Sequence, residues 1–169
     1  STPGGYAYLI VIGADGKLKW YKEFRALWLS TPSLFDIDND GKLDIVVGIT
    51  EIMADTNFRA VLSAYKGDGT LIWSRVSPNP GVSNSAIGDL DGNGSQELVT
   101  SISGRILVTN ARDGSDYQTA IDFPMGTPHA PLLADVDNNG DLEIIVKSDR
   151  SRLGEHKIHV FNKQGNLLP

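Results

Sequence analysis

The chain has 169 residues, a formal net charge of −6 and no cysteine. This length fits one domain with a real core, the acidic charge argues against a nucleic-acid partner, and the lack of cysteine excludes disulfides and thiolate metal sites. No apolar run approaches the ~18 residues of a membrane helix, so we expect no membrane insertion. Residues 1–5 carry no signal-peptide features, from which we expect a mature start or a cut fragment.

Four glycines at predicted turns have similar neighbours in the sequence. Each follows an acidic or amide residue and comes after an apolar, strand-like run, a pattern typical of tight β-hairpins; they are Gly16, Gly69, Gly114 and Gly165. No segment has a helical periodicity long enough to matter, so the sequence predicts an all-β protein. In the second full repeat we expect strands at residues 83–88, 97–101, 105–109 and 116–121.

A nine-residue acidic phrase occurs three times, beginning at Asp36, Asp89 and Asp135. Oxygen side chains stand at positions one, three, five and nine, and glycine at position six allows a sharp turn. Alternate oxygens around such a turn, with a backbone carbonyl from position seven, are how a short loop wraps calcium. The predicted ligands are Asp36, Asp38, Asp40, Lys42 and Asp44; Asp89, Asp91, Asn93, Ser95 and Glu97; and Asp135, Asp137, Asn139, Asp141 and Glu143. We call residues 36–44, 89–97 and 135–143 the first, second and third acidic loops.

Other interpretations of these loops fit less well. A single loop of this kind could be an Asp/Asn-rich turn without an ion, but three copies in register favour calcium. Magnesium demands a tighter octahedral geometry. A helix-loop-helix calcium site needs glutamate at position twelve, where this chain has Val47, Thr100 and Val146. The first loop supplies four carboxylates, so we expect it to bind calcium most tightly.

The spacing of these features predicts a repeat architecture. Units of about 40 to 50 residues with four strands are typical of propeller blades. We expect one β-propeller segment of about three and a half blades of four antiparallel strands, with a half blade at residues 1–30 and blades at residues 31–77, 82–123 and 127–169. A β-sandwich is the alternative. The segment is either a fragment of a longer propeller, which we favour, or a half that pairs with another copy.

The order of apolar strand, Asp-x-Asp-x-(Asp/Asn)-Gly loop, apolar strand and hairpin resembles the FG-GAP repeats, also called VCBS-type repeats. These occur in integrin α-chain propellers and in many secreted microbial proteins. The resemblance covers essentially the whole chain, although the literal Phe-Gly and Gly-Ala-Pro dipeptides are absent. It implies a propeller with calcium in the loops that join the first and second strands of each blade, which gives three calcium sites here.

Residues outside the acidic loops give little sign of catalysis. His129, His156 and His159 are expected to have structural or surface roles, and no nucleophile elbow, phosphate loop or zinc-type histidine motif is present. Trp20 and Trp73 each stand four residues after a turn glycine, so we expect both to pack between strands. For Trp28 the sequence favours neither a position in the core nor an exposed contact. We therefore expect no enzyme activity in this segment.

In a meander of four antiparallel strands, alternate connections emerge at the same end. The acidic loops and the turn glycines should therefore share one end, and the length-variable loops at residues 51–58 and 149–155 the other. The favoured function is a calcium-stabilised extracellular or cell-surface module for recognition, adhesion or scaffolding. We expect it to bind a protein or carbohydrate through the loops opposite calcium. The alternative is the propeller portion of a polysaccharide-degrading enzyme, since some rhamnogalacturonan lyases resemble this type, and a purely structural repeat is a third possibility.

Overall fold

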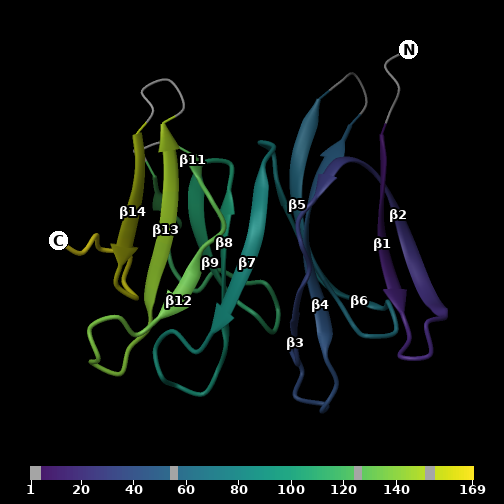
Figure 1. The fold of residues 1–169 in the computed structure, drawn as a ribbon, viewed down its shortest axis with the longest axis horizontal. Coiled ribbons are helices and arrows are strands. Elements are labelled where there is room, and N and C mark those ends of the chain that lie inside the picture. The colour runs from purple at the N-terminus through teal and green to yellow at the C-terminus, as the bar shows by residue number, and fades with distance from the viewer. Residues whose placement is uncertain (1–4, 54–56, 124–126, 151–154) are drawn as a thin grey trace. The chain divides into compact units, whose positions relative to one another are not determined.

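The computed structural model describes residues 5–53, 57–123, 127–150 and 155–169. These residues form antiparallel strands joined by turns, with no helix among them, which confirms the predicted all-β class (Figure 1). In particular, the described part contains no helix that could span a membrane. The chain divides into two compact units, Ser1–Val82 and Ser83–Pro169. The division into a half blade and three blades stays a prediction.

The first unit contains one sheet of six strands. Its path runs β1-β2-β4-β5-β6, with β3 pairing to the other half of β4. The long strand β2 pairs with β1 along most of its length and reaches β4 only through its last residues, Ala26 to Leu29. The strands are β1 Tyr6–Ile12, β2 Leu18–Leu29, β3 Ser33–Phe35, β4 Asp44–Ile52, β5 Phe58–Tyr65 and β6 Leu71–Ser77.

The second unit contains two sheets of four strands. One has the order β10-β9-β8-β7, and in the other β13 pairs with β11, β12 and β14. The strands are β7 Val82–Gly88, β8 Glu97–Ile102, β9 Arg105–Asn110, β10 Ile121–Asp122, β11 Thr127–Pro128, β12 Leu132–Ala134, β13 Glu143–Arg150 and β14 Glu155–Phe161.

Each unit is held together by two layers of strands packed face to face. In the first unit, Leu9 and Val11 of the β1–β2 hairpin pack against Ile45 and Val47 of β4 and Val61 of β5. In the second unit, the apolar residues of β8 and β9 pack against those of β13 and β14, in a core that includes Val99, Ile106, Val108, Ile144, Val146 and Phe161. All six residues of β8 are buried, including the polar residues Glu97, Thr100 and Ser101.

The tryptophans behave largely as predicted. Trp20 packs on the core of the first unit, and its indole Nε1 donates a hydrogen bond to the carbonyl of Gly67 at 2.9 Å. Its ring lies where a Cβ on Gly69 would approach to 3.2 Å, so the turn glycine leaves room for it. Trp73 is buried. Trp28 has 48% of its surface exposed, which settles its two alternatives in favour of an exposed side chain.

One predicted strand is wrong. The fourth strand of the second repeat was expected at residues 116–121, but the chain forms only an isolated bridge at Asp116 and the short β10 at Ile121–Asp122. The preceding turn is one residue longer than its counterpart in the first unit, since the Gly114 N–H bonds the carbonyl four residues back rather than three. After Tyr117 the pairing with β9 resumes only at β10.

The histidines have the structural and surface roles expected from the sequence where their side chains are described. His159 is buried, its Nε2 lies 2.9 Å from the Ser148 hydroxyl, and its ring packs edge-on against Phe123. Burial lowers its pKa, so the neutral ring is the form that fits this core. His129 is exposed. The side chain of His156 lies outside the described residues.

Gly48 of β4 lies close to Val82, which is the last residue of the first unit and the first residue of β7. A Cβ at this position would lie 2.5 Å from the Cγ2 of Val82, which is a steric overlap. We predict that Gly48→Ala destabilises the protein by about 1–3 kcal/mol, because overpacking forces neighbouring atoms to shift. In a Val82→Ala background both Cγ atoms are gone and the closest Val82 atom left is Cβ at 3.2 Å, so the same substitution should cost much less. Denaturant unfolding of the four proteins measures this difference, and equal losses in both backgrounds would contradict the steric explanation.

Candidate metal centres

The three acidic loops share one backbone conformation. In each loop the first aspartate accepts the N–H groups of positions five and six at 2.8–3.1 Å. The side chain at position five in turn accepts the N–H of position seven at 2.7–2.9 Å. Positions four and six both have positive φ angles, which asparagine and glycine tolerate best; they are Asn39, Gly41, Gly92, Gly94, Asn138 and Gly140. The repeated residue types thus specify one local fold three times.

The carboxylate at position nine connects each loop to the sheet. Asp44, Glu97 and Glu143 are the first residues of β4, β8 and β13, and all three are buried. Each accepts the N–H of position two of its own loop, at 3.0, 2.9 and 2.9 Å. The loop is therefore closed by a buried carboxylate that the following strand holds in place.

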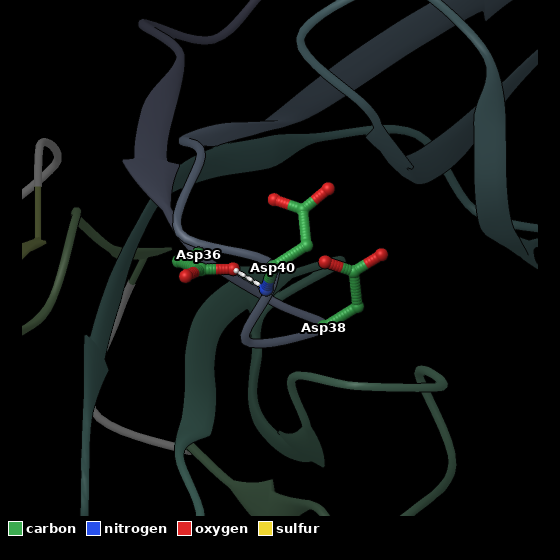
Figure 2. A group of neighbouring side chains, drawn as sticks. All are labelled: Asp36, Asp38 and Asp40. Atoms are coloured by element: carbon green, nitrogen blue, oxygen red, sulfur yellow. Dashed lines mark hydrogen bonds between the residues drawn. The ribbon is translucent and has the colours of Figure 1, made fainter.

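Three carboxylates converge in every loop. In the second and third loops, oxygens from positions one, three and nine lie within 4.8 Å of one another; these residues are Asp89, Asp91 and Glu97, and Asp135, Asp137 and Glu143. In the first loop the converging residues are Asp36, Asp38 and Asp40 (Figure 2). Position nine is here Asp44, whose side chain is one methylene shorter than that of glutamate. The predicted ligands at positions seven, Lys42, Ser95 and Asp141, lie in the same turns through their backbones.

Two carboxylate oxygens support a cation at these loops. Asp38 Oδ1 and Glu97 Oε1 are buried and have no hydrogen-bond partner among the described residues. A buried charged oxygen without a partner is costly, and the cost falls when a cation binds it. Burial raises the pKa of Glu97, and the neighbouring Asp91 and Asp89 raise it further; burial likewise raises the pKa of Asp44. This set of hard oxygen donors fits calcium, which would be held by the carboxylates of each loop.

Sequence analysis did not identify three side chains that contact the loops from outside. Lys66 Nζ donates a hydrogen bond to Asp38 Oδ2 at 2.7 Å, the Tyr117 hydroxyl donates one to Asp91 Oδ2 at 3.0 Å, and Lys163 Nζ lies 2.9 Å from Asp141 Oδ2. The only signal in the sequence was the position of the two lysines: Lys66 and Lys163 stand shortly before the turn glycines Gly69 and Gly165. Within each unit, therefore, the hairpin turns and acidic loops do meet, as their expected common end requires.

These contacts change the electrostatics of the loops. The hydrogen bond and charge of Lys66 outweigh burial and lower the pKa of Asp38. For Asp91, burial raises the pKa, but hydrogen bonds from Tyr117 and Asn93 together lower it below its usual value. Burial and the bond to Asp91 raise the pKa of Tyr117 to about 12, so this hydroxyl stays a donor at neutral pH.

The expected partner-binding loops are only partly visible. Residues 54–56 of the 51–58 loop and residues 151–154 of the 149–155 loop lie outside the described residues. At the base of the first of these loops, Glu51 of β4 forms an ion pair with Arg59 of β5. The role of both loops in partner binding stays a prediction.

Comparison with known proteins supports the resemblance stated above. Residues 36–100, which include the first and second acidic loops, match the family model described as FG-GAP-like repeat. No curated protein sequence matches the chain. The crystal structure of the V. cholerae biofilm matrix protein Bap1 is similar, with a TM-score of 0.53 and 19% identity over 83% of this chain. That likeness concerns the fold, and the chain spans 30% of the length of that protein.

We predict opposite effects of Glu97→Gln with and without calcium. Glutamine keeps the acceptor for the Leu90 N–H but removes a buried charge that lacks a full set of partners. In a chelator the variant should therefore unfold at a higher temperature than the parent protein. In excess calcium it should unfold at a lower temperature, because the second loop loses a ligand charge. Scanning calorimetry measures both, and destabilisation of the same size under both conditions would contradict a metal-ligand role.

Lys66 should weaken cation binding at the first loop, because its ammonium group occupies the carboxylate of Asp38. We predict that Lys66→Met raises the calcium affinity of this loop by about three- to tenfold, with solvent screening limiting the gain. Isothermal titration against calcium measures the change. Lys17→Met is the matched control, since Lys17 pairs with Asp15 in a hairpin turn outside the acidic loops. An unchanged or reduced affinity in the Lys66 variant would mean that its ion pair does not compete with calcium.

Proposed function

Taking residues 36–100 as an FG-GAP-like repeat, we propose that this chain is a calcium-stabilised recognition or adhesion module of an extracellular matrix or cell surface. The observation that carries the proposal is the geometry of the acidic loops. Three loops of the same conformation each bring three carboxylates together, and each is closed by a buried carboxylate at the start of a strand. Likeness to the fold of a biofilm matrix protein favours an extracellular setting.

Calcium would supply positive charge to loops that otherwise hold like charges within a few ångströms. The residues around it already fix the loop backbone, through the bonds from positions one, five and nine. Its role is then structural, since it stabilises the end of the sheet where loops and hairpin turns meet. This leaves the opposite ends of the strands, with the 51–58 and 149–155 loops, to contact a protein or carbohydrate partner.

A non-catalytic role agrees with the distribution of acidic groups. Among the described residues, the sets of three converging carboxylates are those of the three acidic loops, where each has a place in the loop geometry. The buried Ser148–His159 pair packs against Phe123 in the core of the second unit, away from solvent. Binding without turnover is therefore the function that the side chains support best.

The structural role of calcium is tested by calorimetry of the whole chain. Calcium at a hundredfold excess over its dissociation constant should add about 2.7 kcal/mol of stability per site, and a chelator should remove it. Magnesium at the same concentration is the control and should stabilise less, because it demands tighter octahedral geometry. An unfolding temperature that is indifferent to calcium would contradict the proposal.

Binding and turnover are separated by one further assay. The calcium-loaded protein is incubated with insoluble extracellular polysaccharides, and both the retained protein and the chain length of the soluble sugars are measured. A recognition module should be retained and should leave the polysaccharide length unchanged. Shortened sugars would support the polysaccharide-degrading alternative instead.

A further inference from the structure

Asparagine stands directly before glycine at two places in the chain, Asn93-Gly94 and Asn139-Gly140. In both places the asparagine is position five of an acidic loop, and both residues of each pair are exposed. A glycine after asparagine leaves its own backbone nitrogen free to attack the side-chain amide, because no Cβ obstructs the approach. The second and third acidic loops therefore carry a pair of groups that can react with each other.

The loop conformation holds the two reacting atoms of each pair in one small ring. Asn93 Oδ1 accepts the N–H of Ser95 at 2.7 Å, and Asn139 Oδ1 accepts the N–H of Asp141 at 2.7 Å. The ring that such a hydrogen bond closes contains both the side-chain Cγ and the nitrogen of the intervening glycine. The donated N–H also stabilises negative charge on the amide oxygen, which makes Cγ a better target for a nucleophile.

A carboxylate accepts the hydrogen of each attacking nitrogen. The Gly94 N–H donates to Asp89 Oδ2 at 2.8 Å, and the Gly140 N–H donates to Asp135 Oδ2 at 2.9 Å. Both distances lie within the reach of a general base. A Cβ on either glycine would meet nothing within 4 Å, so the space beside the attacking nitrogen is open.

We propose that Asn93 and Asn139 are sites of spontaneous deamidation in the folded protein. The glycine nitrogen forms a bond to the asparagine Cγ while its proton passes to the carboxylate of position one. The bond from Cγ to Nδ2 then breaks, and the amide group takes up that proton and leaves as ammonia. Water opens the resulting five-membered imide at either carbonyl, which gives aspartate or isoaspartate, the latter with a backbone longer by one methylene.

The first loop shows the aspartate product in place. Its position five is Asp40 (Figure 2), and Asp40 Oδ1 accepts the N–H of Lys42 at 2.9 Å, as the asparagine oxygens do in the other two loops. Conversion to aspartate therefore keeps the loop conformation and gives the second and third loops a carboxylate at position five. Conversion to isoaspartate lengthens the loop and breaks its pattern of hydrogen bonds. Ageing of the protein thus changes the charge of these two loops and leaves that of the first loop unchanged.

A matched pair of residues without the carboxylate is available in a hairpin turn. Asp15 precedes Gly16, and Asp15 Oδ1 accepts the N–H of Lys17 at 3.1 Å, so the same hydrogen-bonded ring is present. The Gly16 N–H, however, donates to the carbonyl of Gly13 at 2.9 Å, and the space around Gly16 is also open. The Asp15→Asn variant therefore carries three asparagine–glycine pairs in one molecule, of which two have a carboxylate on the attacking nitrogen.

Peptide mapping of this variant tests the proposal. The protein is kept in a chelator at a temperature at which circular dichroism shows it folded, and mass spectrometry of digests follows the replacement of the amide NH2 by OH at each site. Conversion at Asn93 and Asn139 should be at least about tenfold faster than at position 15, since a positioned base contributes up to ~10²–10⁴-fold. Equal rates at the three sites, or a faster rate at position 15, would overturn the proposal. No divalent cation is present, so the result does not depend on the proposed role of calcium.

Asp135→Asn checks the carboxylate itself, because asparagine keeps an acceptor oxygen for the Gly140 N–H but has no charge to accept the proton. Conversion at Asn139 should slow by about tenfold or more. Asn93 in the same molecule is the control, since its partner Asp89 is unchanged, and its rate should stay as in the parent protein. An unchanged rate at Asn139 would show that the carboxylate takes no part and would overturn the proposal.

Discussion

The structure depends on one contact that occurs three times: a buried carboxylate at the start of a strand accepts the N–H of position two in the preceding loop. This bond ties the acidic loop to the sheet, because Asp44, Glu97 and Glu143 are also the first residues of β4, β8 and β13. A hydrogen bond to a charged group contributes about 1.5–3 kcal/mol, which offsets only part of the cost of burying a carboxylate. The proposed cation would offset the rest of this cost, and without one the apolar layers of each unit have to stabilise the loops.

The three loops share a backbone but differ in what neutralises them. Lys66 donates to the first loop and Lys163 to the third, while the second loop receives an uncharged donor, the Tyr117 hydroxyl. Counting loop carboxylates alone ranks the first loop as the strongest site, but that count leaves out the ammonium group of Lys66. In the second loop Glu97 is fully buried and one of its oxygens has no hydrogen-bond partner among the described residues, while Lys163 acts on Asp91 only through its charge. Affinity at such sites depends on the neighbouring strands as much as on the loop sequence.

The sequence was sufficient for the features that depend on local residue types. Turn glycines, the acidic phrase and the lack of helical periodicity predicted the all-β class and the three converging sets of carboxylates, because loop conformation and strand preference are set within a few residues. Contacts between segments that are distant in the sequence could not be predicted from local residue types. Lys66 lies 28 residues from Asp38, and Tyr117 lies 26 residues from Asp91. The strand expected at 116–121 does not form as predicted, and the turn before it is one residue longer than its counterpart in the first unit, which residue preferences do not encode.

The acidic loops and the stacking of sheets are linked through strand register. Alternate residues share a face, so Glu97 begins a row of β8 that continues with Val99, and Glu143 begins a row of β13 that continues with Ile145 and Lys147. In the second unit the β8 row is covered by β13 and β14, through Ile144 and Val146. A charge at the head of a covered row is destabilising unless it is compensated, and a cation in the loop is placed to compensate it. Neutralisation of the second loop and burial of the β8 row would therefore favour each other, which gives a physical reason for an acidic loop to precede a strand whose first row is covered.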